Sequence, residues 1–411
     1  MKKSKTIWLI QQHSMPPELG HFNRQHNFGK YLKRDGHRPI AFAGSKLHNS
    51  DIQMINDNRK YMLYKKAECP FCFIKTCDYG NSKKKRIIAE LQFHLGLYKN
   101  RKKFPKPDVI LGSSSYMMSA CLAIILAKKY KCKSIVEVRD IWPQSIVDFL
   151  GYSPKNPIIR FLYRVEKWMY THADELVFTM PGGKDYIVDH KLDKAHGGGV
   201  DLSKVHNINN GVDLEKFIEE KEEYPFYDED LADPNKTCIV YTGSVRLANN
   251  IKYIVQIAER FEGSNIYFLI YGNGNEVEEL TKYCEDHQIH NIVFKGHVEK
   301  EYIPSLLSQA DFLLLHFDQT NVVEKYGYSF NKFFDYLAAG KPIISTVGSR
   351  FEMVESSGVG ILCPNDDAKT ASEMIQKLID QGADEKCKER AQAMAEQYSF
   401  RNLTYTLEKL F

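Results

Sequence analysis

The sequence predicts an α/β protein built from two doubly wound parallel sheets. Short apolar segments rich in β-branched residues alternate with helical segments, first over residues 6–179 and again over residues 238–346. This alternation is typical of parallel strands joined by helical crossovers. A chain of 411 residues is also too long for one ordinary hydrophobic core, so two domains are expected.

The composition is that of a globular protein in water. Hydrophobic residues make up 43% of the chain and charged residues 26%. No uninterrupted apolar run reaches the ~18 residues that a membrane span requires. The first apolar segment, residues 7–10, is followed at once by Gln11, Gln12 and His13, so it is interpreted as a buried strand rather than a signal peptide. We therefore expect the protein in the cytoplasm.

The first domain is predicted to span residues 1–213. Strands are expected at residues 6–10, 39–43, 109–111, 134–138 and 175–179, and helices at residues 22–33, 112–129 and 157–172. Ligands of such sheets bind beyond the carboxyl ends of the strands, so the polar loops that follow the strands are candidate binding loops.

The second domain is predicted to span residues 237–395, after an acidic region at residues 214–236 that is interpreted as a structureless linker. Its strands are expected at residues 238–241, 266–271, 291–294, 310–316 and 342–346, and its clearest helices at residues 250–261 and 331–339. The last segment, residues 396–411, is expected to form a helix that packs back on the first domain.

The helix predicted at residues 331–339 carries the first candidate site. Its apolar side chains recur at helical spacing, and Gly340 follows as a left-handed cap. Because a helix N-terminus presents unpaired N–H groups and partial positive charge, it suits an anion such as a diphosphate. Lys332 would add a full charge there, and Asp335 could accept hydrogen bonds from sugar hydroxyls. The alternative is a surface ion pair on an ordinary amphipathic helix.

Glycine-rich turns follow several predicted strands of the second domain. Gly243-Ser244-Val245-Arg246 stands between a strand and a helix, where glycine lets the backbone approach phosphate oxygens and Arg246 could bind a diphosphate. Gly272-Asn273-Gly274 and Gly296-His297 follow the next strands. All of these turns would fall on one rim of one sheet, together with Lys332 and Asp335.

Two basic runs, Lys83–Arg86 and Lys99–Lys103, bracket an apolar segment at residues 87–98. Such a basic amphipathic stretch could lie on an anionic membrane surface, and residues 160–167 form a second basic segment. Nucleic acid is disfavoured, because no zinc-finger spacing or RNA-recognition motif accompanies the charge. The alternative is that these runs are solvated helix ends.

Cys69-Pro-Phe-Cys72 and Cys77 form a cysteine cluster. Without an export signal, the nine cysteines are expected to be thiols rather than disulfides. The cluster could also bind zinc with His94 as a fourth ligand, or act as a redox motif.

Six segments carry a resemblance to family four of the retaining GT-B glycosyltransferases. In chain order they read IVEVRDIWPQSI (Ile135–Ile146), VEKWMYTHADELVFTMPGGKDYI (Val165–Ile187), INNGVDLEKF, IYGNGNEVEEL, VFKGHVEKEYIPSLLSQADFLLL and YGYSFNKFFDYLAAGKPII. The resemblance covers nearly the whole chain except residues 46–105 and the acidic region. It is to the bacterial branch that builds O-antigen and capsule, and in particular to UDP-N-acetyl-L-fucosamine transferases.

The resemblance implies that two Rossmann-like domains face a cleft and that the second domain holds the sugar nucleotide. Asp335 matches the acidic residue on the nucleotide ribose, Arg246 the arginine on the diphosphate, and Lys332 lies in the segment that reads PNK in relatives. The remaining implied donor-binding residues are Gly20, Gly243, Ser244, Gly272, Asn273, Gly274, Gly296, His297, Val298, Glu324, Tyr328, Ser329 and Asn331. Asp140 is implied to orient the acceptor or take its proton; alternatively it pairs with Arg139 or caps a helix.

Some positions depart from the family pattern. Gly327 stands where many members have a glutamate beside the donor sugar, and Glu324 lies three residues earlier. Ile251 stands in place of the usual lysine five residues after the arginine. Phe330 replaces the proline of the PNK segment, and His21 follows Gly20 where a second glycine is usual.

The resemblance implies transfer of a sugar, N-acetylated or a 6-deoxy amino sugar, from UDP to a polyprenyl-diphosphate-linked glycan at the inner face of the membrane. No cofactor or metal is expected, because cationic side chains and a helix N-terminus would neutralise the departing diphosphate. Two alternatives stay open: an inactive sugar-nucleotide-binding partner of another transferase, and a sugar-nucleotide epimerase that shares the fold.

Overall fold

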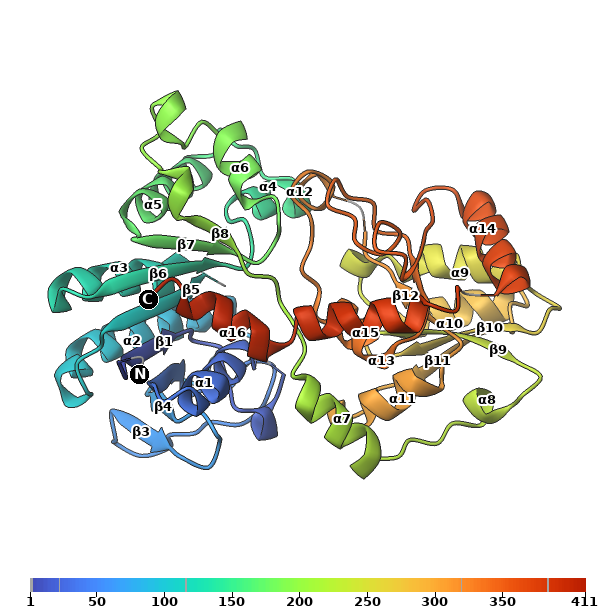
Figure 1. Cartoon of the computed structure of the whole chain (residues 1–411), viewed down its shortest axis with the longest axis horizontal. Coiled ribbons are helices and arrows are strands. Elements are labelled where there is room, and N and C mark those ends of the chain that lie inside the picture. Colours follow the sequence, from blue (N-terminus) through green and yellow to red (C-terminus); the bar gives the residue numbers. More distant parts are fainter. Residues whose placement is uncertain (1–2, 22, 115–116, 319, 383) are drawn as a thin grey trace. The chain divides into compact units, whose positions relative to one another are not determined.

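The computed structural model describes residues 3–21, 23–114, 117–318, 320–382 and 384–411. Its contacts divide the chain into two compact units, one made of Met1–Asn209 with Phe400–Phe411 and the other of Asn210–Ser399. Figure 1 shows a β-sheet flanked by helices in each unit. Residue 22, where the first predicted helix begins, and residues 115–116, within the second, lie outside the described residues.

The first unit is built on one sheet in the order β3-β4-β2-β1-β5-β6-β7-β8. All neighbouring strands run parallel except β3, which is antiparallel to β4. The strands are β1 Thr6–Ile10, β2 Arg38–Gly44, β3 Tyr61–Tyr64, β4 Phe71–Ile74, β5 Val109–Ser114, β6 Lys133–Val138, β7 Glu175–Phe178 and β8 Val205–Asn207.

The helices of the first unit cover this sheet. They are α1 Arg24–Arg34, α2 Lys83–Asn100, α3 Met117–Tyr130, α4 Gln144–Leu150, α5 Pro157–His172, α6 Gly183–Asp189 and α16 Phe400–Glu408. The chain's last helix, α16, packs on α1, where the rings of Phe28 and Phe400 meet edge to face at 5.4 Å. Helix α3 contacts both α2 and α5, so these three helices form one continuous layer.

The second unit is built on a parallel sheet in the order β11-β10-β9-β12-β13-β14. The strands are β9 Thr237–Thr242, β10 Ile266–Tyr271, β11 Ile292–Gly296, β12 Phe312–Leu315, β13 Ile343–Ser345 and β14 Gly360–Leu362. Alternate residues of β9 enter different cores, Cys238 and Val240 on one face and Ile239 and Tyr241 on the other. The sheet is therefore buried on both faces, as a parallel sheet requires.

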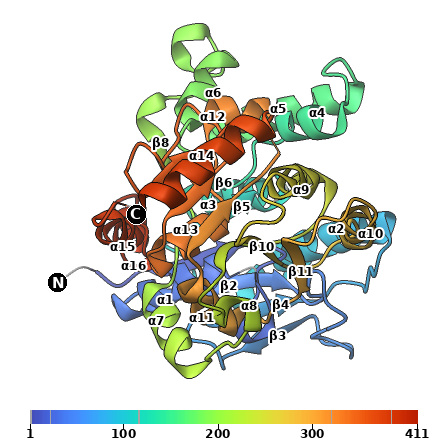
Figure 2. The ribbon, with the colours of Figure 1, turned by 90° about the vertical axis from the view of Figure 1, so that its right-hand side faces the viewer.

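The helices of the second unit are α7 Leu214–Glu223, α8 Glu229–Ala232, α9 Ile251–Glu259, α10 Val277–Asp286, α11 Ile303–Gln309, α12 Asn321–Tyr326, α13 Asn331–Ala339, α14 Ala368–Gln381 and α15 Cys387–Gln397. On one face of the sheet, α7 and α11 lie side by side, as Figures 1 and 2 both show. The prediction for α13 is confirmed at both ends, including the left-handed cap at Gly340, whose φ is 69°.

The prediction of a structureless acidic linker is wrong, because residues 214–236 contain α7 and α8. Asp228 caps α8 by accepting a hydrogen bond from the Asp230 N–H at 2.9 Å, and its carboxylate also pairs with Lys295 at 2.8 Å. Asp230 pairs with Lys236 and Lys295, each at 2.5 Å. Through Lys295, the acidic side chains thus attach this segment to β11 of the second unit.

In the described residues, the cysteine cluster is not arranged as a metal site. The nine cysteines all lie in the described part of the chain and are all free thiols. Cys69 and Cys72 are buried, and burial raises the pKa of each thiol to about 12, which leaves little reactive thiolate. No group of three or more metal-ligating side chains gathers anywhere in the described residues. The zinc alternative for Cys69, Cys72, Cys77 and His94 is therefore wrong.

Candidate functional site

Three loops at the carboxyl ends of β9, β10 and β11 are joined to one another by backbone hydrogen bonds. The Gly243 N–H donates to Tyr271 O at 3.0 Å, and the Gly272 N–H donates to Gly296 O at 2.7 Å. In addition, the Val245 N–H donates to the Asn273 carbonyl at 3.0 Å. The glycine turns singled out in the sequence therefore do lie together on one rim of the second sheet.

Close backbone approach makes two of these glycines indispensable. A Cβ on Gly272, whose φ is +150°, would lie 1.7 Å from the Gly243 carbonyl oxygen. A Cβ on Gly274 would lie 1.7 Å from Val245 O. Both contacts are with backbone atoms, which cannot rotate away as the end of a flexible side chain could. Packing alone thus demands these glycines, whatever ligand the rim binds.

Lys332, in the first turn of α13, reaches this rim. Its Nζ lies over the Tyr241 ring at 4.0 Å and donates a long hydrogen bond of 3.5 Å to the carbonyl of His316. It also lies 3.0 Å from the position that a Cβ on Gly243 would take. The side chain is half-buried, and this desolvation lowers the pKa of Lys332 to about 7.

The N-terminus of α13 adds unpaired backbone donors beside Lys332. Its N-cap residue is Phe330, which has no side-chain oxygen, and the first turn carries no acidic residue. Exposed Asn331 is the first helical residue. The helix start therefore keeps its partial positive charge, and together with Lys332 it suits an anion.

Asp335 lies one turn further along α13. No ion pair joins Asp335 to Lys332 in the described residues, so the alternative of a surface pair on an amphipathic helix is wrong. Burial raises the pKa of Asp335 to about 6, opposed by the positive charge of Lys300 and reinforced by Glu220. A half-buried carboxyl with unused acceptor oxygens is suited to receive hydroxyl donors.

Arg246 is exposed on the loop after β9, and no carboxylate pairs with it in the part of the chain that the structure describes. The loop itself is held in place, because the Asn249 side-chain amide donates to Ser244 Oγ at 2.7 Å. Arg246 is therefore an available cation on an anchored loop.

The remaining predicted residues of the second unit differ in their surroundings. Tyr328 is buried and stacks on Phe330 at 5.0 Å, so it contributes to the core. The Ser329 hydroxyl accepts a hydrogen bond from the Asn210 N–H at 2.7 Å, which leaves its own proton to donate. Glu324 is exposed on α12.

His297 and Val298 follow β11, at the edge of the sheet. His297 is exposed, with its Nε2 3.5 Å from the carboxylate of Glu299, and Val298 is half-buried. Both residues adjoin Gly296, whose carbonyl receives the N–H of Gly272. They therefore border the rim that the glycine loops form.

Sequence reasoning missed His316, which ends the segment predicted as a strand at residues 310–316. Its ring is buried, with Nδ1 2.6 Å from Thr346 Oγ1 and Nε2 3.0 Å from the Asn250 carbonyl. Burial lowers the pKa of His316 to about 4, so the ring is neutral near pH 7. Its position at a strand end, next to the predicted site, was the signal that could have identified it.

Gly20 and Asp140 belong to the first unit. Gly20 has a φ of +149° in the loop before α1, and Asp140 is exposed beyond β6. The first unit also contains a buried ion pair that the sequence did not indicate, with Arg24 Nε 2.7 Å from Glu137 Oε1. The Ser113 hydroxyl donates to the other oxygen of Glu137, also at 2.7 Å, which fixes the carboxylate.

Two units, each built on a largely parallel sheet with polar loops at the strand ends, form the GT-B fold, and solved glycosyltransferases with that fold match nearly the full chain. Anabaena Alr3699/HepE in complex with UDP aligns with a TM-score of 0.68 at 13% identity, covering 98% of each chain. The lipopolysaccharide outer core galactosyltransferase WaaB aligns with a TM-score of 0.60 at 13% identity, covering 98% of each chain.

Sequence comparison extends this from fold to family. A family model described as "Glycosyltransferase Family 4" matches residues 20–216, and one described as "Glycosyl transferases group 1" matches residues 226–396. The probable glycosyltransferase WbjE of Pseudomonas aeruginosa is 21% identical over 318 residues, which are 74% of this chain and 75% of WbjE. The chain belongs to the family 4, group 1 glycosyltransferases, which use nucleotide sugars.

Proposed function

We propose that this chain is a retaining glycosyltransferase that moves a sugar from a UDP-sugar to a lipid-linked glycan intermediate of a bacterial surface polysaccharide. The observation that carries the proposal is the convergence of Lys332, the uncapped start of α13 and the glycine rim in one place. HepE, a structural relative, has been solved with UDP and with UDP-glucose. The donor sugar we propose is an N-acetylated or 6-deoxy amino sugar.

The chemical demand of the reaction is to stabilise negative charge on the departing diphosphate. Lys332, the N–H groups at the start of α13 and Arg246 would supply it, without a metal ion. Asp335 would hold the ribose of the nucleotide through its carboxylate. Asp140, on the first unit, would orient the acceptor hydroxyl or take its proton. No side chain is assigned as a covalent nucleophile.

A membrane-docking surface supports a lipid-linked acceptor. On α2, Ile87, Leu91 and Leu95 follow one another at one-turn intervals and are 64%, 44% and 54% exposed. On α5, Ile158 and Phe161 are 68% and 60% exposed, so Phe161 is not a core residue. Both helices belong to one layer and carry flanking lysines and arginines. Apolar side chains in a basic surround suit the interface of an anionic membrane.

Binding of UDP tests the donor assignment. UDP- and GDP-sugars are screened for a rise in the thermal unfolding temperature, because a ligand that binds only the folded state stabilises it. UDP at about 100 times its Kd should add about 2.7 kcal/mol to the free energy of unfolding. GDP should add less. Equal stabilisation by both nucleotides, or none by UDP, would refute a UDP-sugar donor.

Membrane docking is tested with vesicles that contain anionic lipid. Leu95→Glu should release the protein, and added salt should do the same by screening the lysines. Tyr227→Glu, which changes a still more exposed aromatic residue of the second unit, is the control and should have no effect. Release by both variants alike would contradict a docking surface on α2.

One observation favours a second candidate, an inactive partner that binds the sugar nucleotide for another transferase. Gly327, with a φ of +83°, supplies no carboxylate at the position where relatives place a glutamate. This candidate would be established if the chain bound UDP but transferred no sugar from any UDP-sugar by itself, and if transfer appeared only when a second transferase was added. Conversion of the donor sugar without any acceptor would instead indicate an epimerase.

A further inference from the structure

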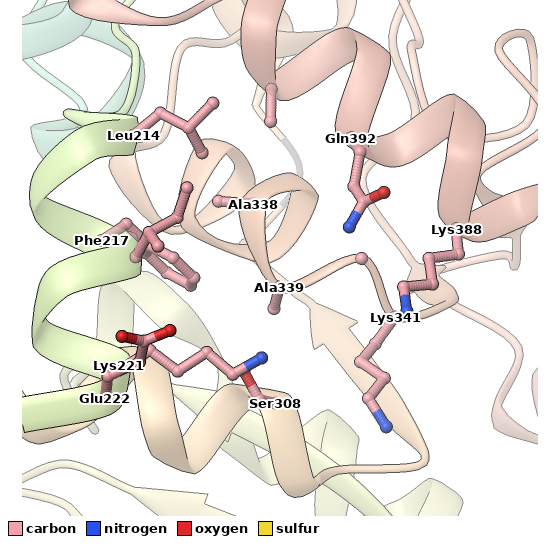
Figure 3. A pocket seen from close by; sticks show the side chains of 13 residues that line it. Leu214, Phe217, Lys221, Glu222, Ser308, Ala338, Ala339, Lys341, Lys388 and Gln392 are labelled. Atoms are coloured by element: carbon pink, nitrogen blue, oxygen red, sulfur yellow. The ribbon is translucent and has the colours of Figure 1, made fainter. Parts of the chain in front are cut away.

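A separate pocket of about 550 Å³ lies at the carboxyl end of α13. Its walls come from α7, α11, α13 and α15, all within the second unit (Figure 3). Lys332 lies near the opposite end of α13 and Asp335 at its middle, and neither lines the pocket. The volume falls in the range of small-molecule sites, which is roughly 300–1,000 Å³.

One wall of the pocket is apolar. Leu214 and Phe217 project from α7 towards Ala338 and Ala339 at the end of α13 (Figure 3). The two alanines and the following Gly340 leave the space open, because larger side chains there would fill it. This wall can receive an aliphatic group.

The other side of the pocket carries three lysines. Lys221 reaches across from α7 towards α11, while Lys388 extends from α15 towards Lys341 (Figure 3). None of the three forms an ion pair with any residue that the structure describes. Glu222 also lines the pocket, so the lining carries a net positive charge.

The lysines repel one another. Burial lowers the pKa of Lys341, Asp311 opposes this shift, and the positive charges of Lys221 and Lys388 lower the pKa further. The carboxyl end of α13 carries only about half a negative charge, which cannot balance three ammonium groups. A bound dianion would relieve the repulsion, and lysine is a common partner of phosphate.

We propose that this pocket binds an organic phosphate that carries an aliphatic chain. The phosphate lies among Lys221, Lys341 and Lys388, and the chain lies on Phe217 and the two alanines. A soluble phosphorylated metabolite and a lipid phosphate in a membrane share this chemistry.

The test measures binding of octyl phosphate to the full chain by calorimetry, with octanol and inorganic phosphate beside it. Lys341→Met and Lys388→Met remove a charge and keep an apolar stem, and Ala339→Leu fills the apolar wall. Lys377→Met, which removes an exposed lysine of α14, is the matched control. A second arm replaces octyl phosphate with vesicles that contain phosphatidic acid.

We expect octyl phosphate to bind one to one, and more tightly than octanol or inorganic phosphate. Each of the three pocket variants should weaken it at least about tenfold, and Lys377→Met should not. If the pocket variants weaken the binding of octyl phosphate in buffer, the ligand is a soluble phosphate. If they weaken only the binding to vesicles, the ligand is a lipid. Equal loss in Lys377→Met, no effect of Ala339→Leu, or no binding in either arm up to about 1 mM would overturn the proposal.

UDP binding is measured on the same variants. We expect it to be unchanged, since the pocket residues lie apart from Lys332. This readout separates the two proposals, because octyl phosphate binding does not depend on whether the chain also binds UDP.

Discussion

UDP affinity should depend on pH through Lys332. In the free protein the pKa of this lysine is about 7, because burial of the ammonium group disfavours its charged form. A bound diphosphate favours the charged form and raises the pKa, so binding takes up a proton above about pH 7. Affinity is therefore fully present below pH 7 and falls as the pH rises above it.

The size of the effect follows from the charged fraction. With a pKa of about 7, Lys332 is about 90% charged near pH 6 and about 10% charged near pH 8, so affinity should fall by up to about tenfold between them. His316 does not contribute, because its pKa of about 4 keeps its ring neutral over this range. Asp335 has a pKa of about 6 and would titrate nearby, so Asp335→Asn is measured in parallel.

Calorimetric titration with UDP across this pH range is the assay. Lys332→Arg, which stays charged at every pH used, corrects for the titration of UDP itself, whose terminal phosphate has a pKa of about 6. Lys332→Met should bind UDP weakly at all pH values. If the wild-type affinity followed the same pH profile as Lys332→Arg, or if Lys332→Met bound UDP normally, the assignment of Lys332 would fail.

The same pKa predicts a stability effect of opposite sign. In the free protein between about pH 7 and pH 10.5, the unfolded chain keeps a proton on Lys332 that the folded chain has lost. The free energy of unfolding should therefore rise with pH across this window. Lys332→Met should be more stable than the wild type below pH 7, as measured by thermal unfolding without ligand.

Three further predictions test other parts of the structure. Asp335→Ala should weaken UDP binding about tenfold, the value of roughly two hydrogen bonds to the ribose, and leave pyrophosphate binding unchanged; equal loss of both would place Asp335 elsewhere. Gly272→Ala should destabilise the fold by about 2–3 kcal/mol, because its Cβ meets the carbonyl of Gly243, whereas Gly263→Ala, which has open space, should cost less in the same denaturant titration. Arg24→Met should destabilise the first unit by about 3–5 kcal/mol by removing the ion-pair partner of the buried Glu137 carboxylate, and a smaller loss in thermal unfolding would contradict that role.

Periodicity in the sequence was enough to predict most strands and α13. The start of α13 at Asn331 and its cap at Gly340 follow from the types of the neighbouring residues. The same reasoning missed the strands β3, β4, β8 and β14 and helices such as α12, and gave the acidic region no structure. In that region the order comes from Lys295, which pairs with Asp228 from 67 residues away. Such a contact leaves no trace in local spacing.

For the candidate site, the strand-end glycines and Lys332 could be selected because parallel strands place their carboxyl ends on one rim. The depressed pKa of Lys332 could not, since it follows from the burial of this side chain in the folded protein. The pocket at the other end of α13 was also out of reach. Its lysines come from α7, from α15 and, for Lys341, from the residues just before β13. Only the folded chain brings them together.

The packing of α16 on α1 has a consequence for biosynthesis. The ribosome makes residues 210–399 after most of the first unit, but the first unit's core still lacks Phe400, Leu403 and Leu407 until residues 400–411 have been made. The surface of α1 that α16 covers is therefore exposed in the first unit while the second unit is made and folds. A premature stop near residue 399 would thus remove α16 and destabilise the first unit, although most of that unit is translated first.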